Sequence, residues 1–183
     1  MVWNEIVSMI CVFCSASIFS YSLLRKSKKN ILWIQIMSGI LYTSSYFVLI
    51  PVIESALIGG AVALVEFIRI IAFYLIEKYS NQKKKILNLV VGLFFVIVIA
   101  FLSKFTWTSW VCVFPLVGGV IVGFALCVQS VLTIKICYLI QTTCAIIYLF
   151  LMSLYFNGIS QIFVLIVGFC GLIITLRKRL NSE

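Results

Sequence analysis

Seven long apolar stretches divide this 183-residue chain and leave only short polar connections between them. The stretches cover residues 4–24, 30–50, 55–77, 86–103, 108–128, 132–153 and 159–176. A helix needs about 20 apolar residues to cross a hydrocarbon layer about 30 Å thick, and each stretch is close to that length. A segment inside a bilayer must pair its own backbone polar groups, which favours helices. The sequence therefore predicts an all-α, polytopic membrane protein with seven transmembrane helices.

The composition agrees with a protein that lies almost entirely in the membrane and argues against an enzyme. Hydrophobic residues make up 64% of the chain, charged residues 10%, and the chain contains neither histidine nor aspartate. Ser-His-Asp hydrolysis, zinc-dependent proteolysis and two-aspartate chemistry therefore lack their residues. Cys11 and Cys14 form a CxxC inside an apolar stretch, without a second pair of ligands. We expect no catalytic residues, no metal site and no cofactor.

Basic residues cluster at alternate connections, which is the pattern of membrane topology and not of a nucleic-acid-binding surface. One set of segment ends carries twelve basic residues, the other set carries only Lys104, and Arg69 lies within a segment. The positive-inside rule then places the N-terminus outside and the C-terminus in the cytoplasm of a bacterial-type inner membrane. The twelve are Arg25, Lys26, Lys28, Lys29, Lys78, Lys83, Lys84, Lys85, Lys135, Arg177, Lys178 and Arg179.

A weak internal repeat relates the second segment to the sixth. Lys29 and Lys135 match at an offset of 106 residues, and so do Gln35 and Gln141. Parallel repeats joined by one linker helix keep both halves in the same orientation. We therefore expect a three-plus-one-plus-three arrangement in one membrane domain over 1–183, with repeats at 4–77 and 108–176 and a linker helix at 86–103.

In both copies a glutamine precedes a tyrosine by seven residues, so the two side chains share one helix face. The pairs are Gln35 with Tyr42 and Gln141 with Tyr148, and Tyr46 extends the first face by one turn. A glutamine in hydrocarbon needs a partner, so both faces should point into the protein. They could serve as interhelical hydrogen-bonding groups or line a polar path.

Four stretches carry a resemblance to a known family. These are "RKSKKNILWIQIMSGILYTSSYFVLI", "IRIIAFYLIEKYSNQKKK", "FPLVGG" and "GISQIFVLIVGFCGLIITLRKR". They resemble the YgjV-type bacterial inner membrane proteins and, through them, the MtN3-like small transporters, which include the SWEET and PnuC carriers. The resemblance implies the three-plus-one-plus-three architecture and, by analogy, small-solute transport. The residues that match the family pattern are Gln35, Tyr42, Arg69, Phe73, Tyr74, Pro115 and Ser160.

The stretch "LVEFIRIIAFY" places Glu66 and Arg69 three residues apart near the middle of the third segment. Their backbone positions differ by about 4.5 Å along a helix axis and lie on neighbouring parts of one face. A charge at that depth costs roughly 2.5–3.5 kcal/mol on insertion scales, so the pair should face inward. Four interpretations remain open. The pair could be a structural ion pair, a polar lining for a solute or a proton-coupling site, or Arg69 could extend to the cytoplasmic edge beside a protonated Glu66.

The fifth segment combines Pro115 with Gly118, Gly119 and Gly123. Inside a helix, proline removes one hydrogen bond and gives a kink, while Gly119 and Gly123 allow another backbone to approach closely. Close packing around a fixed kink is one interpretation. A hinge for alternating access, formed by Pro115, Gly118 and Gly119, is the other.

The sequence therefore favours a carrier for a small polar solute that binds at mid-membrane between the two repeats. The proposed solute contacts are Gln35, Tyr42, Tyr46, Glu66, Arg69, Gln141 and Tyr148. One alternative is the substrate-binding subunit of a vitamin importer, which would have six helices and a separate energising subunit. Another is a non-transporting membrane interaction or assembly protein. The expected partners are the lipid bilayer and a solute, with no nucleic acid; a homo-oligomer is compatible with the sequence but not required by it.

Overall fold

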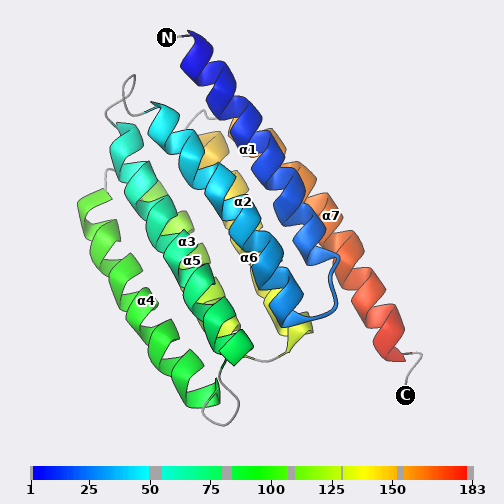
Figure 1. Cartoon of the computed structure of the whole chain (residues 1–183). Helices are drawn as coiled ribbons and strands as arrows, with labels where there is room; N and C mark the ends of the chain where they lie inside the picture. Colours follow the sequence, from blue (N-terminus) through cyan, green and yellow to red (C-terminus); the bar gives the residue numbers. More distant parts are fainter. Residues whose placement is uncertain are drawn as a thin grey trace.

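A computed structural model describes residues 2–49, 55–79, 84–106, 110–128, 130–151 and 155–180 (Figure 1). These ranges contain seven α-helices, one short 3-10 helix and no strand. Six helical spans in these ranges are long and apolar enough to cross a membrane, and one of them, Trp110–Cys127, joins the 3-10 helix to the α-helix that follows it. The remaining α-helix, Ser55–Tyr79, carries four charged residues. The prediction of an all-α polytopic membrane protein is confirmed. The elements are α1 (Val2–Leu23), α2 (Lys28–Leu49), α3 (Ser55–Tyr79), α4 (Lys84–Thr106), η1 (Trp110–Cys112), α5 (Val113–Cys127), α6 (Val131–Leu151) and α7 (Tyr155–Leu180).

Helix boundaries differ from the apolar stretches mainly at the polar ends. α4 begins at Lys84 and α7 continues to Leu180, beyond Arg177, because a helix extends past the hydrocarbon region that a hydropathy pattern detects. The fifth stretch was predicted to start at residue 108, but α5 begins at Val113 and the 3-10 turn precedes it. Positions 50, 108 and 153, where three predicted segments begin or end, lie outside the described ranges.

The helices form two layers (Figure 1). In one layer α2 packs between α1 and α3, and in the other α6 packs between α5 and α7. The layers face each other, with α1 packed on α7, while α4 lies at the edge against α3 and α5. This order brings the middle helices α2 and α6 to the centre of the bundle. The internal repeat itself stays a prediction.

The two termini lie at opposite ends of the bundle (Figure 1). The lower end in that view, called the basic end below, contains the last turns of α1, α3 and α7 and the first turns of α2, α4 and α6. Those turns and the adjoining connections hold the basic residues that the sequence assigned to one side, whereas Lys104 lies at the other end of α4. The charge asymmetry is therefore a property of the folded bundle. Which end faces the cytoplasm stays a prediction.

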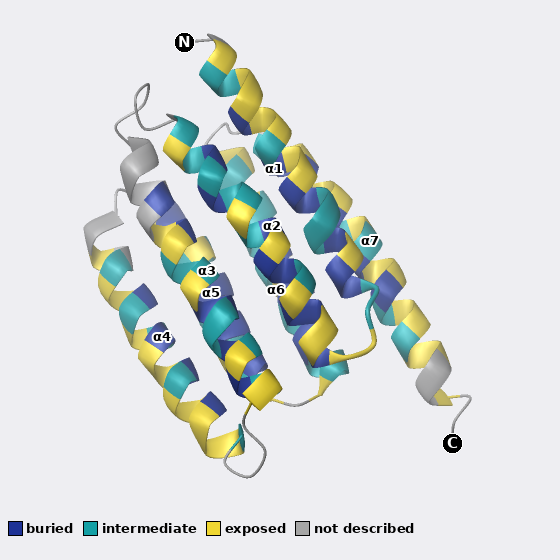
Figure 2. Cartoon of the chain, viewed as in Figure 1, coloured by how far each residue is buried: buried dark blue, intermediate teal, exposed yellow. Residues whose placement is uncertain are grey.

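Polar and apolar residues are distributed in the reverse of the soluble pattern. Figure 2 shows exposed residues on the outward sides of the helices, and many of them are large apolar side chains such as Trp3, Ile97 and Phe101. The interior contains an apolar core around Phe73, Val122 and Ile134. It also encloses polar and charged side chains that a membrane interior cannot solvate, namely Lys28, Gln35, Arg69, Asn88 and Lys135.

Candidate functional site

Arg69 is the charged side chain at the centre of the bundle. Its residue is only 1% exposed. Its Nη2 donates to the carboxylate of Glu66 on the same helix, and its Nη1 donates to the carbonyl oxygen of Gly119 on α5, 3.1 Å away. Arg69 therefore joins the two layers near the middle of α3. The prediction that the pair faces inward is confirmed for Arg69, whereas the side chain of Glu66 is 25% exposed.

Two features show that the ion pair is neither fully hydrogen-bonded within the described residues nor fully buried. The Nε of Arg69 is buried and has no hydrogen-bond partner in the described part of the chain. The side chain of Glu66 is 25% exposed, so it is not fully enclosed. A buried donor without an acceptor costs free energy, and an acceptor on a ligand or water would relieve that cost.

A second contact between the layers lies beside Arg69. The hydroxyl of Tyr138 on α6 donates to Oε1 of Gln35 on α2, at 2.8 Å, and both residues are buried. Gln35, Tyr138, Glu66 and Arg69 all lie in the middle turns of their helices. The Nε2 of Gln35 has no partner among the described residues. The site therefore contains two unpaired buried donor groups, one on α2 and one on α3.

Three tyrosines continue the polar region away from the basic end. The hydroxyls of Tyr42 and Tyr46 lie 3.1 Å apart, and their rings meet edge to face. Tyr148 lies ten residues after Tyr138 on α6, in the half of that helix away from the basic end. We call Gln35, Tyr42, Tyr46, Glu66, Arg69, Tyr138 and Tyr148 the central polar cluster.

Among the seven predicted solute contacts, Tyr42 pairs with Tyr46 and Glu66 pairs with Arg69, while Gln35 pairs with Tyr138. Their role as solute contacts stays a prediction. Gln141 is half-buried against α5, where a Cβ on Gly118 would lie 3.1 Å from its Cγ. Within the described residues it makes no hydrogen bond to the central polar cluster. Sequence reasoning missed Tyr138, which is the hydrogen-bond partner of Gln35. The sequence showed only that Tyr138 is a further polar side chain in the apolar stretch 132–153, which gave no reason to choose it as a partner.

The hinge candidates lie in the first half of α5. Pro115 is the third residue of α5, directly after the 3-10 turn Trp110–Cys112, and a proline is tolerated in the first turn of an α-helix. The predicted kink stays a prediction. Gly118 and Gly119 are buried, the latter facing Ile99 and Glu66. Their hinge role stays a hypothesis.

Two buried lysines were predicted only as topology signals. Lys135 donates to the carbonyl of Gly171, at 3.1 Å, and to the hydroxyl of Thr175, at 2.8 Å, and so binds α6 to α7 within one layer. Lys28 donates to the carbonyls of Leu126 and Val128 at the end of α5. The described ranges hold no group of three His, Cys, Asp or Glu side chains that could hold a metal ion.

Residues 6–179 match the family described as bacterial inner membrane protein, Imp-YgjV. The chain belongs to the YgjV family. This YgjV protein is accordingly a multi-pass protein of the bacterial inner membrane, in contact with the lipid bilayer. Searches of curated proteins and of solved structures found no match.

The central polar cluster of this YgjV protein consists of groups that form hydrogen bonds. It contains one guanidinium, one carboxylate, one amide and four phenols, all suited to hydrogen bonding. The unpaired groups at Arg69 and Gln35 are donors. A molecule with carbonyl or carboxylate oxygens would complement them.

Proposed function

We propose that the protein is a carrier that binds a small polar solute at the central polar cluster and moves it across the inner membrane. The observation that carries this proposal is the position of Arg69, which is 1% exposed and bonded to both layers, yet keeps one donor unpaired. Intramembrane ionisable residues are costly and are functional candidates by default. A solute between the layers would replace contacts that hold the layers together, which is what alternating access requires.

The unpaired donors define the class of solute. Arg69 Nε and Gln35 Nε2 both need acceptors, so the solute should carry at least one carbonyl or carboxylate oxygen. Glu66, 25% exposed, and the tyrosine hydroxyls can accept from a hydroxyl, amine or amide on the same molecule. The resemblance to the MtN3-like carriers, which move small polar molecules, supports the same class.

A ligand screen with the detergent-purified full chain tests the binding step. Nucleosides, vitamin precursors, sugars and small organic anions are added at millimolar concentration and the midpoint of thermal unfolding is measured. A ligand that binds only the folded state raises Tm with its saturation. We expect a saturable rise that Arg69→Met abolishes. Lys135→Met is the matched control, because it also removes a buried positive charge but leaves the central polar cluster intact.

Uptake of the same solute into proteoliposomes tests the transport step. Glu66→Gln and Arg69→Met should each abolish uptake at unchanged protein incorporation, while Lys135→Met should keep it. Uptake that survives both substitutions would refute the proposed site.

A second candidate is a non-transporting interaction or assembly protein. It is favoured by the fact that Glu66, Arg69 and Gly119 satisfy much of each other's hydrogen bonding and thereby fix the packing of α3 on α5. In that case the combined replacement Glu66→Leu with Arg69→Leu should preserve function, since an apolar pair of similar volume can replace a buried ion pair. For a carrier, the same double variant should fold and fail to transport.

The importer-subunit alternative is less well supported. It expects six helices, with both termini on one side, whereas the described ranges hold seven helices and the termini lie at opposite ends (Figure 1). Co-purification of the full chain with an energising subunit would support the importer-subunit alternative.

A further inference from the structure

The face of α3 that carries Arg69 continues toward the basic end. Phe73 and Glu77 follow Arg69 at intervals of four residues and therefore lie on the same side of the helix. Phe73 is fully buried in the apolar core. The ring of Phe73 lies close to α4 and α2. A Cβ added to Gly92 on α4 would be 3.7 Å from the ring, and Nζ of Lys28 on α2 is 5.7 Å from the ring centre. Phe73 thus separates the central polar cluster from a second polar region.

Glu77 and Lys84 form the outer part of that region. Lys84 Nζ donates to Oε1 of Glu77 at 3.1 Å. The other carboxylate oxygen, Oε2, is buried and has no partner in the described ranges. Lys28 Nζ lies 5.7 Å from the centre of the ring of Phe73, one turn before Glu77, so α2, α3 and α4 each contribute a charged side chain to this end of the bundle.

Asn88 forms the inner part. It lies one turn beyond Lys84 on the same face of α4 and is 0% exposed. Neither its Oδ1 nor its Nδ2 has a hydrogen-bond partner among the described residues. Its backbone oxygen accepts a hydrogen bond from the thiol of Cys127 on α5, with 3.3 Å between the two atoms. Asn88 therefore lies where α4 contacts α5. An amide buried without partners in a membrane protein costs stability, and a polar molecule that visits the position would supply the missing partners.

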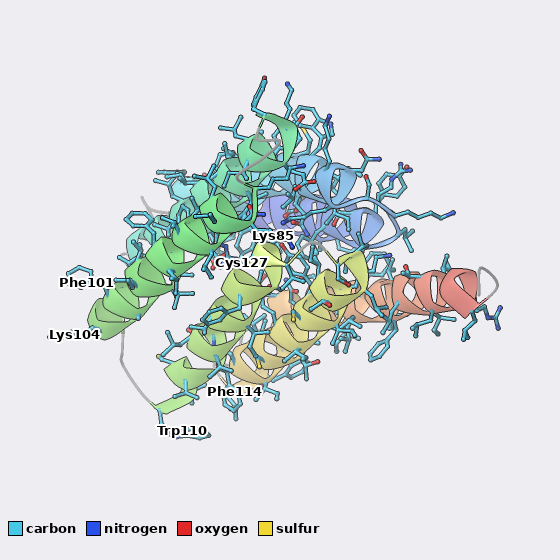
Figure 3. The ribbon with its side chains drawn as sticks, turned by 90° about the horizontal axis from the view of Figure 1, so that it is seen from below. Lys85, Phe101, Lys104, Trp110, Phe114 and Cys127 are labelled. Atoms are coloured by element: carbon cyan, nitrogen blue, oxygen red, sulfur yellow. The ribbon has the colours of Figure 1, made fainter. Side chains whose placement is uncertain are left out.

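Lys28 closes the region on the side of α5. It is 5% exposed, and its Nζ donates to the carbonyl oxygens of Leu126, at 2.6 Å, and Val128, at 3.3 Å. These carbonyls end α5, where a positive charge is favourable. The contact therefore joins α2 of one layer to α5 of the other at the basic end. Figure 3 looks at the bundle from this end, with Cys127 at the near end of α5 and Lys104 at the far end of α4.

We propose that Lys28, Glu77, Lys84 and Asn88 form a second binding site for the transported solute at the basic end, beyond Phe73, and that the contact of Lys28 with α5 closes its exit. This inference rests on the proposed carrier function. The site offers the amide donor and acceptor of Asn88, a carboxylate oxygen and two ammonium groups. It suits a small molecule that carries both an acceptor, such as a carbonyl or carboxylate, and a donor, such as an amide, amine or hydroxyl. Phe73 is the apolar barrier between the two sites.

Thiol labelling from the basic end tests the closure without knowledge of the solute. In a variant that keeps Cys127 and has its six other cysteines replaced by serine, a membrane-impermeant maleimide is applied to the basic side of the vesicles. Lys28→Met should raise the labelling rate of Cys127 about tenfold, the order expected when a hydrogen bond from a charged donor is lost. Lys28→Arg should restore slow labelling, because it keeps the charge and the donors.

Lys135→Met is the matched control for this experiment. It also removes a buried lysine bonded to a backbone carbonyl, but that bond lies within one layer. Labelling of Cys127 should stay at the parent rate in this variant. An unchanged rate in Lys28→Met, or an equal rise in Lys135→Met, would overturn the closure by Lys28.

A second measurement keeps the site testable if Lys28→Met does not fold. Asn88→Cys and Ile99→Cys place single thiols on α4 at two buried positions, in the basic half and the opposite half of the helix. With Lys28 intact, the impermeant reagent applied to the basic side should label Asn88→Cys several times faster than Ile99→Cys. Equal rates at the two positions would overturn a solute-accessible site at Asn88.

Uptake separates this inference from the proposed function. Asn88→Leu should lower uptake and leave the ligand-induced rise in Tm in place, because the central polar cluster is intact. Full uptake by Asn88→Leu would overturn the second site while the central site stands. Uptake that survives Arg69→Met, together with rapid labelling of Asn88→Cys, would instead refute the central site alone.

Discussion

Arg69 on α3 donates from Nη1 to the carbonyl oxygen of Gly119 on α5, across 3.1 Å between the two helix layers. A backbone carbonyl has two lone pairs, so Gly119 can accept from a side chain in addition to its own helix. The second guanidinium branch binds Glu66 on α3 itself. One side chain thus links an ion pair within a helix to a hydrogen bond between layers.

Removal of Arg69 alone should cost more stability than removal of the whole pair. In Arg69→Met the largely enclosed Glu66 loses its counter-charge, and we expect a loss of about 3 kcal/mol, at the lower end of the range for broken buried pairs because Glu66 is 25% exposed. In the Glu66→Leu, Arg69→Leu double variant no charge remains unpaired, and most of that loss should be recovered. Chemical unfolding in detergent measures both. Equal losses would show that Glu66 is adequately solvated in the folded protein.

Sequence reasoning identified this pair because intramembrane charges are rare and expensive, and the helices followed from length and apolarity alone. It could not identify Tyr138 as the partner of Gln35. Gln35 needed some partner, but which residue of α6 lies opposite depends on how the two layers pack, and the sequence had singled out Gln141 and Tyr148 on that helix.

The burial of Lys28 could not be predicted from the sequence for a related reason. Lys28 and Lys29 are indistinguishable as flanking charges, yet Lys28 is buried and Lys29 exposed. Lys28 lies on the side of α2 that faces the end of α5, and the position of that end is set by tertiary packing. The burial of Asn88 could not be predicted either. An asparagine near the start of an apolar stretch is common, and only the structure shows that its amide is buried without partners among the described residues.

The hydrogen bond between Gln35 and Tyr138 should show measurable coupling between the two layers. Gln35→Leu and Tyr138→Phe each remove one partner of the 2.8 Å bond, and the double variant removes both. A double-mutant cycle on unfolding free energy should give a coupling of about 1 kcal/mol, within the range found for interhelical hydrogen bonds in membranes. Gln141→Leu with Tyr138→Phe is the control cycle and should be additive. Additivity in the first cycle would mean that the contact contributes nothing.

Replacement by alanine should lower the stability of the protein much more at Gly171 than at Gly119. A Cβ on Gly171 of α7 would run into the backbone carbonyl of Leu23 at the end of α1, which cannot move aside without shifting a helix. A Cβ on Gly119 would meet Ile99 at 3.4 Å and Glu66 at 3.6 Å, which are ordinary contact distances. We expect Gly171→Ala to cost about 1–3 kcal/mol, as overpacking does, and Gly119→Ala to stay within about 1 kcal/mol of the parent. Thermal unfolding ranks the two, and the reverse order would contradict the close approach of α1 and α7.

Asn88→Leu should raise stability, which is unusual for a substitution in a buried position. Both polar atoms of the Asn88 amide are buried without partners, so its replacement by an apolar side chain of similar size removes a desolvation cost of about 1–3 kcal/mol. Asn30→Leu, at an exposed position at the start of α2, is the control and should change Tm little. A lower Tm in Asn88→Leu would mean that the amide is held by ordered water and contributes to folding.

The asymmetry of charge predicts the orientation of the bundle. The basic end holds the exposed Lys26, whereas Lys104 is exposed at the opposite end of α4. Positively charged connections are retained in the cytoplasm, so the basic end and the C-terminus should face the cytoplasm and the N-terminus the outside. In a cysteine-free background, Lys26→Cys should be labelled by an impermeant reagent only in inverted vesicles, and Lys104→Cys only in intact spheroplasts. Because the two positions lie at opposite ends of the bundle, labelling of both from the same side would contradict a single orientation and indicate a dual topology.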